Sequence, residues 1–143
     1  MKVYETLHLV KGEDLNHHET LFAARTASWL IEAGFATAAS EHGDTDEVVL
    51  RNVHEISYVK PVKKGTIVKL KGRVVLAGSS SLMVAVTAEN SLTGEKVVES
   101  YFTFVTIHKE KGGKRVHGVV LDEPVDEEEE RLRTKALKIK ETL

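Results

Sequence analysis

Five consecutive polar residues, Asn16 to Thr20, carry the functional groups that hydrolytic chemistry uses. The run contains an amide, two imidazoles, a carboxylate and a hydroxyl. A carboxylate can activate water or attack a carbonyl carbon, and N–H donors can stabilise the negative charge that develops on the carbonyl oxygen. Because such residues also bond to their own backbone, they favour a loop. The sequence therefore predicts a loop with an amide donor, Asn16, and an acid, Glu19.

A second acid, Glu32, lies among apolar neighbours further along the chain. Burial raises the pKa of an unpaired carboxyl group, which suits it to act as a general base. In an extended loop His17 and His18 would point in opposite directions, so no shared metal ion is expected. The candidate catalytic residues are Asn16, Glu19 and Glu32, and the candidate binding residues beside them are His17, His18 and Thr20.

Each candidate also has a structural interpretation. Asn16 can cap a turn, Glu19 can be an acid in the first turn of a helix, and Glu32 can pair with Arg25 on the same helix face. The histidines can be ordinary loop residues. The sequence leaves both interpretations open.

Basic and hydroxyl-bearing segments are candidates for binding phosphate. Lysines supply positive charge, and a serine-rich turn supplies hydroxyls and backbone amides. Solubilising lysines and turn-forming serines are the alternative. The candidates are Lys60, Lys63 and Lys64, the strand residues Lys69, Lys71 and Arg73, and the turn Gly78, Ser79, Ser80 and Ser81.

The elements that would position these residues are one long helix and several strands. Residues 3–10 are typical of a strand, and residues 21–42 predict a helix that is apolar nearly all round and ends at Gly43. Arg25, Ser28 and Glu32 recur at helical spacing and share one stripe of this helix.

Four further strands follow, in residues 47–59, 66–76, 82–88 and 97–108. Val68, Leu70, Val74 and Leu76 alternate with basic residues, which predicts a strand with one face in water. The last strand is apolar on both faces and is expected to be central. Residues 126–143 begin with acids and end with bases, as a helix favours, and their stripe Leu132, Ala136, Ile139 and Leu143 can dock on another surface.

Composition places the chain among globular proteins. Its 143 residues suit one domain, and its formal charge of −2 gives no overall attraction to nucleic acid. Without cysteine there are no disulfides or thiolate nucleophiles. No secretion signal is visible, and the most apolar stretch, residues 21–39, carries charges that a membrane span avoids. We therefore expect a cytoplasmic protein with no membrane or nucleic-acid partner.

A helix that is apolar all round needs a sheet curled about it. The expected fold is α+β: a curved antiparallel five-stranded sheet wrapped around one long buried helix, the hotdog fold, plus a C-terminal helix. We expect the hotdog domain in residues 1–118 and a charged, helical tail in residues 119–143.

Five sequence blocks resemble the cytosolic acyl-CoA thioesterase branch of the hotdog superfamily. They begin at Asn16 (NHHETLFAAR), Trp29 (WLIEAG), Ile56 (ISYVKPVKKGTIV), Ala77 (AGSSSL) and Tyr101 (YFTFV). The resemblance covers roughly residues 3 to 110. It implies a homo-oligomer, either a dimer or paired dimers up to a hexamer, with acyl-CoA bound between protomers and no separate cofactor.

The resemblance also implies site residues, and the chain departs from it at three of them. Asn16 matches the polar residue of the loop, but the acid about fifteen positions later in the helix is Ile31, with Glu32 next to it. The family's Gly-Gly pair is Ala23-Ala24, and Glu19 replaces a small residue. Under this resemblance the basic and serine-rich candidates would bind the nucleotide end of coenzyme A.

Three functions remain open. The first is an acyl-CoA thioesterase, in which Asn16 and helix-start amides polarise the thioester and Glu32 or Glu19 activates water. The second is an acyl-CoA-binding protein without catalysis, since Ile31 replaces the acid. The third is an enoyl-CoA hydratase, because Asp14-Leu-Asn16-His-His is similar in part to a hydratase motif, although its Pro and final His are missing.

Overall fold

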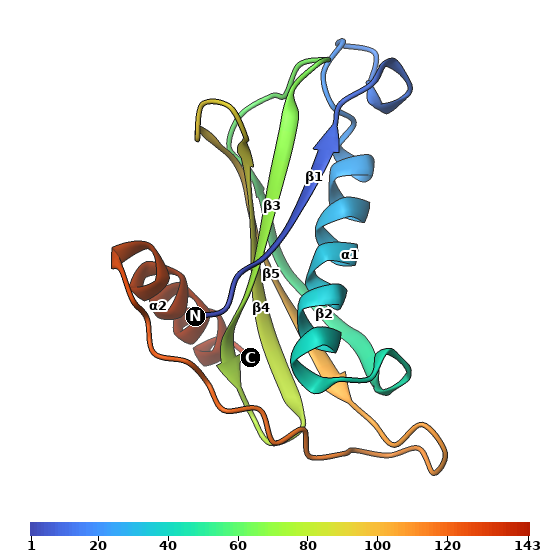
Figure 1. The fold of residues 1–143 in the computed structure, drawn as a ribbon, viewed down its shortest axis with the longest axis vertical. Helices are drawn as coiled ribbons and strands as arrows, with labels where there is room; N and C mark the ends of the chain where they lie inside the picture. The colour runs from blue at the N-terminus through green and yellow to red at the C-terminus, as the bar shows by residue number, and fades with distance from the viewer.

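The structure, a computed structural model, describes residues 1–143 and contains one five-stranded antiparallel sheet with a helix on each face (Figure 1). The strands lie in the order β1-β3-β4-β5-β2. The elements are β1 (Tyr4–Leu9), α1 (Ala23–His42), β2 (Val48–Tyr58), β3 (Ile67–Ala77), β4 (Ser81–Asn90), β5 (Lys96–Thr106) and α2 (Glu127–Glu141). The predicted hotdog fold with its C-terminal helix is confirmed.

The main core lies between α1 and the inner face of the sheet. Alternation in β4 directs Leu82, Val84, Val86 and Ala88 to this side, as expected, and all four are buried. Helix α1 contributes Leu30 and Ala33 to the same cluster. The helix begins two residues later than predicted, and Gly43 ends it in the left-handed conformation with φ 95°.

The prediction that α1 is buried nearly all round is wrong for the single chain. Arg25, Ser28 and Glu32 form the exposed stripe expected from their spacing, and Ala24 and Ala36 are exposed as well. The reason is that the sheet covers one side of the helix only. Ile31 and Phe35, between the covered and exposed sides, are partly buried.

The prediction that Leu76 shares a face with Val68, Leu70 and Val74 is wrong, because β3 contains a β-bulge. Val68, Leu70 and Val74 face α1, but the pairing with β4 shifts between Val74 and Leu76. Because side-chain direction alternates with each residue, this extra residue sends Leu76 to the opposite face, where it packs against the second apolar cluster.

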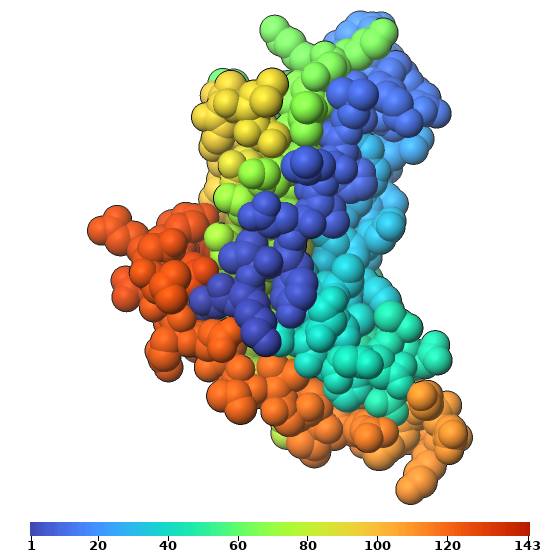
Figure 2. Space-filling model, in the orientation of Figure 1, coloured from blue at the N-terminus to red at the C-terminus, as the bar shows by residue number.

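Helix α2 covers part of the outer face of the sheet (Figure 2). Leu132 and Ala136 are fully buried against Val75, Met83 and Tyr101. The predicted C-terminal helix is therefore confirmed over Glu127–Glu141, whereas residues 119–126 are not helical. Its apolar stripe packs on the sheet at Leu132, Ala136 and Ile139, but Leu143 is exposed beyond the end of the helix. The prediction that one face of β3 is exposed to water is wrong at Arg73, near the middle of the strand, because this side chain is buried beneath α2.

An ionic network built on buried acids holds α2 to the sheet. Glu99 on β5 accepts hydrogen bonds from Arg131, at 2.6 and 3.1 Å, and from the Tyr101 hydroxyl, at 2.9 Å, and it also pairs with Lys96. Burial alone would raise the pKa of Glu99, but these donors hold it down at about 2. Arg73 pairs with Glu129 of α2 at 3.3 Å.

Both edges of the sheet are open. The outer strands β1 and β2 each pair with only one neighbour. Four large side chains along the β2 edge are between 43 and 59% exposed, which is unusual for apolar side chains at the edge of a sheet. They are Val49, Val53 and Tyr58 on β2, and Val59 directly after it. Natural sheets rarely leave such an edge uncovered.

Candidate functional site

A cavity of about 260 Å³ lies between the start of α1 and the end of β2. Its walls are mostly apolar, with a few polar groups, as is typical of ligand sites. The lining residues are Asn16, Thr20, Leu21, Ala23, Thr26, Tyr58, Val59, Lys60, Pro61, Val62 and Val98. Three predicted site residues, Asn16, Thr20 and Lys60, are therefore brought together here.

Asn16 organises the loop before α1. Its side-chain oxygen accepts from the backbone N–H of His18 at 2.8 Å and of Thr20 at 3.3 Å, and its amide nitrogen donates to the Thr20 hydroxyl at 3.1 Å. The turn-capping interpretation thus holds. An amide nitrogen carries two N–H groups, and only one of them is used in this turn, so Asn16 retains one donor.

The N-terminus of α1 has no side-chain cap. Phe22 occupies the cap position and offers no acceptor, and the backbone amides of Ala23, Ala24 and Arg25 have no hydrogen-bond partner. The first amides of a helix, together with its dipole, attract negative charge. Since Ala23 lines the cavity, this helix end can stabilise an oxyanion there.

Tyr58 lines the cavity, although the sequence interpretation did not single it out. Its hydroxyl donates to the carbonyl oxygen of Ala23 at 2.7 Å and so ties the end of β2 to the start of α1. Partial burial of the side chain raises the pKa of Tyr58, which keeps the phenol protonated as a donor. Its position two residues before Lys60-Pro61, within a block already recognised, was the available signal.

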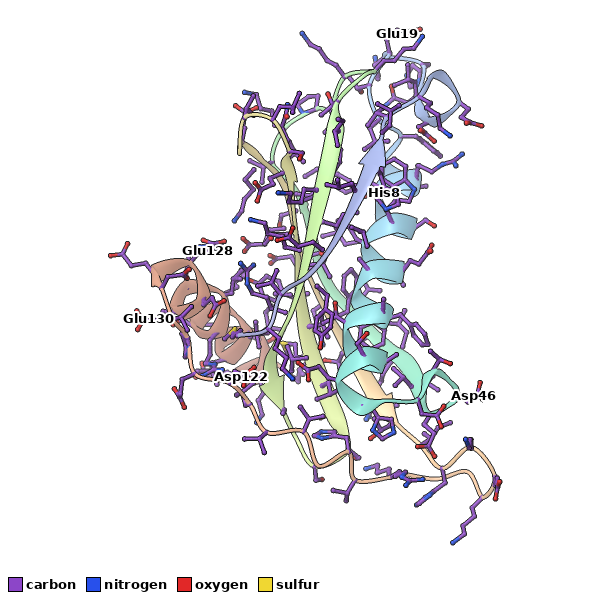
Figure 3. The ribbon with its side chains drawn as sticks, in the orientation of Figure 1. His8, Glu19, Asp46, Asp122, Glu128 and Glu130 are labelled. Atoms are coloured by element: carbon purple, nitrogen blue, oxygen red, sulfur yellow. The ribbon has the colours of Figure 1, made fainter.

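Glu19 lies at the tip of the loop, exposed and outside the cavity lining (Figure 3). It is the only residue other than glycine with a positive φ, 63°. The left-handed conformation is unfavourable for a residue with a Cβ atom, so the loop is strained at this point. A small residue such as glycine would relieve that strain.

The prediction that His17 and His18 point in opposite directions is wrong. The segment is a turn rather than an extended loop, and the two rings pack together with centroids 3.9 Å apart. Both histidines are exposed. No group of three or more His, Cys, Asp or Glu side chains is arranged to hold a metal ion.

Glu32 does not meet Asn16 within one chain. It is exposed rather than buried, and it is absent from the cavity lining. Arg25, its expected structural partner, instead contacts Asp14 at 3.5 Å. Glu32 lies on the side of α1 near His8, whose ring stacks on Trp29 at 4.4 Å and whose pKa burial lowers.

The phosphate-binding candidates are divided between the two ends of the sheet. Lys60 lines the cavity and pairs with Glu95 at 2.7 Å, while Lys63 bridges to Thr20 through backbone pairing. The turn of Gly78, Ser79, Ser80 and Ser81 lies at the opposite end, because it joins β3 and β4 where β5 ends. Its carbonyl oxygens accept from Thr106 and His117. One protomer therefore does not bring this turn to Asn16.

Neither helix combines the length and apolar character that crossing a bilayer requires.

The single curved sheet, the helix packed in its concave face and the cavity at the helix start define a hotdog-fold protein. Residues 18–95, more than half of the chain, match the family model described as the thioesterase superfamily. The chain belongs to this superfamily. Comparison with curated proteins finds no match.

Solved structures of similar fold include acyl-CoA hydrolases. An acyl-CoA hydrolase from Staphylococcus aureus, in complex with butyryl coenzyme A and coenzyme A, is 26% identical with a TM-score of 0.85, over 98% of this chain and 85% of that one. A hexameric acyl-CoA thioesterase is 28% identical with a TM-score of 0.82, over 98% and 89%. An acyl-CoA hydrolase from Bacillus cereus is 25% identical with a TM-score of 0.76, over 97% and 84%.

Proposed function

We propose that the chain is an acyl-CoA thioesterase that hydrolyses acyl-CoA to a carboxylic acid and coenzyme A. The observation that carries the proposal is the uncapped N-terminus of α1, which opens beside an apolar cavity that also contains Asn16. Support comes from the acyl-CoA hydrolases that share the fold along nearly the whole chain.

The mechanism follows from these groups. The thioester carbonyl lies at the helix start, where the free amides of Ala23 and Ala24 and the spare donor of Asn16 stabilise the developing oxyanion. Leu21, Val62 and other apolar walls hold the acyl group. A carboxylate, Glu19 or Glu32, activates water and takes its proton. Neither carboxylate lines the cavity of its own protomer. The carboxylate must therefore reach the thioester by movement of the loop that carries Glu19, or be supplied by a partner protomer.

Self-association is part of the proposal. The open β2 edge with its exposed valines can pair with the same edge of a second copy, and the adjacent small residues Ala24 and Ala27 allow two α1 helices to lie close together. Structural relatives include a hexamer. Light scattering on wild type and a Val53→Lys variant, which places a charge in the edge, tests this: the variant should dissociate, and an unchanged mass would contradict β2 pairing.

A non-catalytic acyl-CoA binder is the second candidate. The specific observation that favours it is the absence of any Asp or Glu from the cavity lining. Binding would survive the loss of a catalytic carboxylate, because the apolar walls and helix amides remain. A hydratase is less well supported, since Asp14 is buried outside the cavity and held by Arg25 and the backbone of Lys11.

Thiol release from short, long and aromatic acyl-CoAs tests the proposal, with binding measured in parallel. The wild type is compared with Glu19→Gln, Glu32→Gln and the double variant, and with Glu13→Gln as a matched control on an exposed loop acid. Turnover that falls at least a hundredfold in the double variant and not in the control supports a catalytic carboxylate at Glu19 or Glu32 in place of the one missing at Ile31. Saturable binding with hydrolysis at the background rate would make the chain a binder, and full turnover in the double variant would contradict the mechanism.

A further inference from the structure

A basic hairpin follows β5 at the end of the sheet opposite to Asn16. Ile107 pairs with Lys114, and the backbone N–H of His108 donates to the Gly113 carbonyl oxygen at 3.0 Å, so residues 107–115 fold back on themselves. Figure 2 shows the hairpin projecting from the body in light orange. It encloses a concavity of about 640 Å³, lined by Glu47, His108, Lys109, Glu110, Lys111, Lys114, Arg115 and Val116.

Positive charge is concentrated in this concavity. Four Lys or Arg side chains and a histidine line it against two glutamates, although the whole chain is slightly acidic. Lys109 is paired with Asp44 at 2.9 Å and Arg115 with Glu47 at 2.9 Å. Lys111 and Lys114 have no carboxylate within 4.0 Å, so their charges remain available to an external anion.

Buried Glu47 fixes the hairpin to the start of β2. Its two carboxylate oxygens bind His42 at 2.9 Å, Arg115 at 2.9 Å and the backbone N–H of Lys109 at 3.3 Å, and its side chain is only 4% exposed. The hydrogen bond with His42 is the largest of the contributions that lower the pKa of Glu47, which keeps it charged. Because Glu47 immediately precedes β2, these contacts anchor the hairpin beside the first residue of that strand.

The two ends of β2 therefore carry two different sites. Val48, at its start, is next to the hairpin, and Tyr58, at its end, lines the Asn16 cavity. Figure 3 shows this separation, with Glu19 at one end of the molecule and Asp46 at the other. When two β2 strands pair about a two-fold axis they run antiparallel, so the start of one strand lies near the end of the other. The partner's hairpin is thus carried toward the cavity.

We propose that the basic hairpin of one protomer binds the phosphate groups of the nucleotide end of coenzyme A, while the acyl thioester occupies the Asn16 cavity of the other protomer. This inference rests on the proposed function and deepens it by assigning the phosphate-binding residues. Lys111 and Lys114 contact the phosphates, and Glu47 positions the hairpin that carries them. The site is complete only in the dimer.

Calorimetric binding of coenzyme A and of pantetheine, which lacks the nucleotide and its phosphates, tests the proposal. In a Lys111→Gln/Lys114→Gln variant the Kd for coenzyme A should rise about tenfold, as expected for two lost charge contacts, while the Kd for pantetheine should not change. A Lys138→Gln/Lys140→Gln variant removes the same charge from the exposed side of α2 and should bind coenzyme A like wild type. Adenosine 3′,5′-bisphosphate should compete with coenzyme A in wild type and fail to do so in the hairpin variant.

The outcomes separate the two proposals. If wild type binds coenzyme A and the hairpin variant binds it equally well, the hairpin inference is overturned while the proposed function stands. If wild type binds neither coenzyme A nor acyl-CoA, the proposed function fails, and the inference fails with it.

Mixed oligomers test the contribution of the partner. The hairpin variant is co-expressed with a differently tagged Val59→Trp variant, whose indole fills the rim of the cavity. In a mixed dimer the hairpin variant supplies an intact cavity and the Val59→Trp variant supplies an intact hairpin. These two parts form one complete site, so one of the two sites should bind coenzyme A with the wild-type Kd. Only weak binding in the mixed dimer would mean that hairpin and cavity do not combine across protomers.

Discussion

Replacing Gly72 by alanine tests how closely α1 approaches the sheet and therefore how the site-bearing helix is positioned. Gly72 lies in the middle of β3 beneath α1. An added Cβ atom would lie 2.0 Å from the hydroxyl oxygen of Thr37 and 3.1 Å from its Cβ atom. Thr37 is fully buried and donates to the Ala33 carbonyl oxygen at 2.8 Å, so turning its hydroxyl away would break a buried hydrogen bond.

We expect Gly72→Ala to lower the free energy of unfolding by about 1.5 kcal/mol. Overpacking of a core costs about 1–3 kcal/mol, and the reduced entropy of the unfolded alanine chain offsets about 0.5 kcal/mol of that. In urea this corresponds to a midpoint lower by about 1 M for a typical dependence on denaturant. Thr37→Ala in the same chain removes the closest contact and should restore most of the loss.

The control for this prediction is Gly12→Ala. A Cβ atom there meets nothing closer than the flexible end of Lys64 at 3.9 Å, so its midpoint should stay close to that of wild type. A Gly72→Ala variant as stable as the control, or a double variant no more stable than Gly72→Ala alone, would refute the close approach of α1 to β3.

Three further predictions concern α2, the buried acid and the strained loop. Leu132→Ala should lower the free energy of unfolding by about 2–4 kcal/mol, because it leaves a cavity under α2. Leu137→Ala, which changes a side chain that is 45% exposed, should alter the urea midpoint little. Equal effects of the two substitutions would contradict the docking of α2 on the sheet. Because the pKa of Glu99 is held at about 2, below its ordinary value, its contribution to stability is present above about pH 5 and is lost as the pH falls toward 2. The Tm of Glu99→Gln should accordingly change less with pH over that range than the Tm of wild type. The same dependence of Tm on pH in both proteins would be evidence against the pairing of Glu99 with Arg131. Glu19→Gly should raise the free energy of unfolding by about 1 kcal/mol by relieving the positive φ, while Glu19→Gln should not; chemical denaturation distinguishes the two, and equal stability would mean that the loop is not strained there.

The sequence alone determined the strands, the helices and the face on which most side chains lie. The alternation of β4, the glycine that ends α1 and the acid-to-base order of α2 are local patterns, and each predicted its element correctly. The Asn16 turn was equally local, since Asn16 bonds only to residues within four positions of itself. Location in the cytoplasm, in contrast, stays a prediction.

Only the tertiary structure decided which candidates share a site. Tyr58 enters the cavity because β2 ends beside α1, and the serine-rich turn lies far from Asn16 because β3 and β4 run the full length of the sheet. Leu76 changes face at a bulge that periodicity does not encode. Glu32 is exposed because the sheet covers one side of α1, and burial of a helix face depends on what packs against it from distant parts of the chain or from a second protomer. Periodicity specifies which side chains point together, whereas long-range packing decides what they meet.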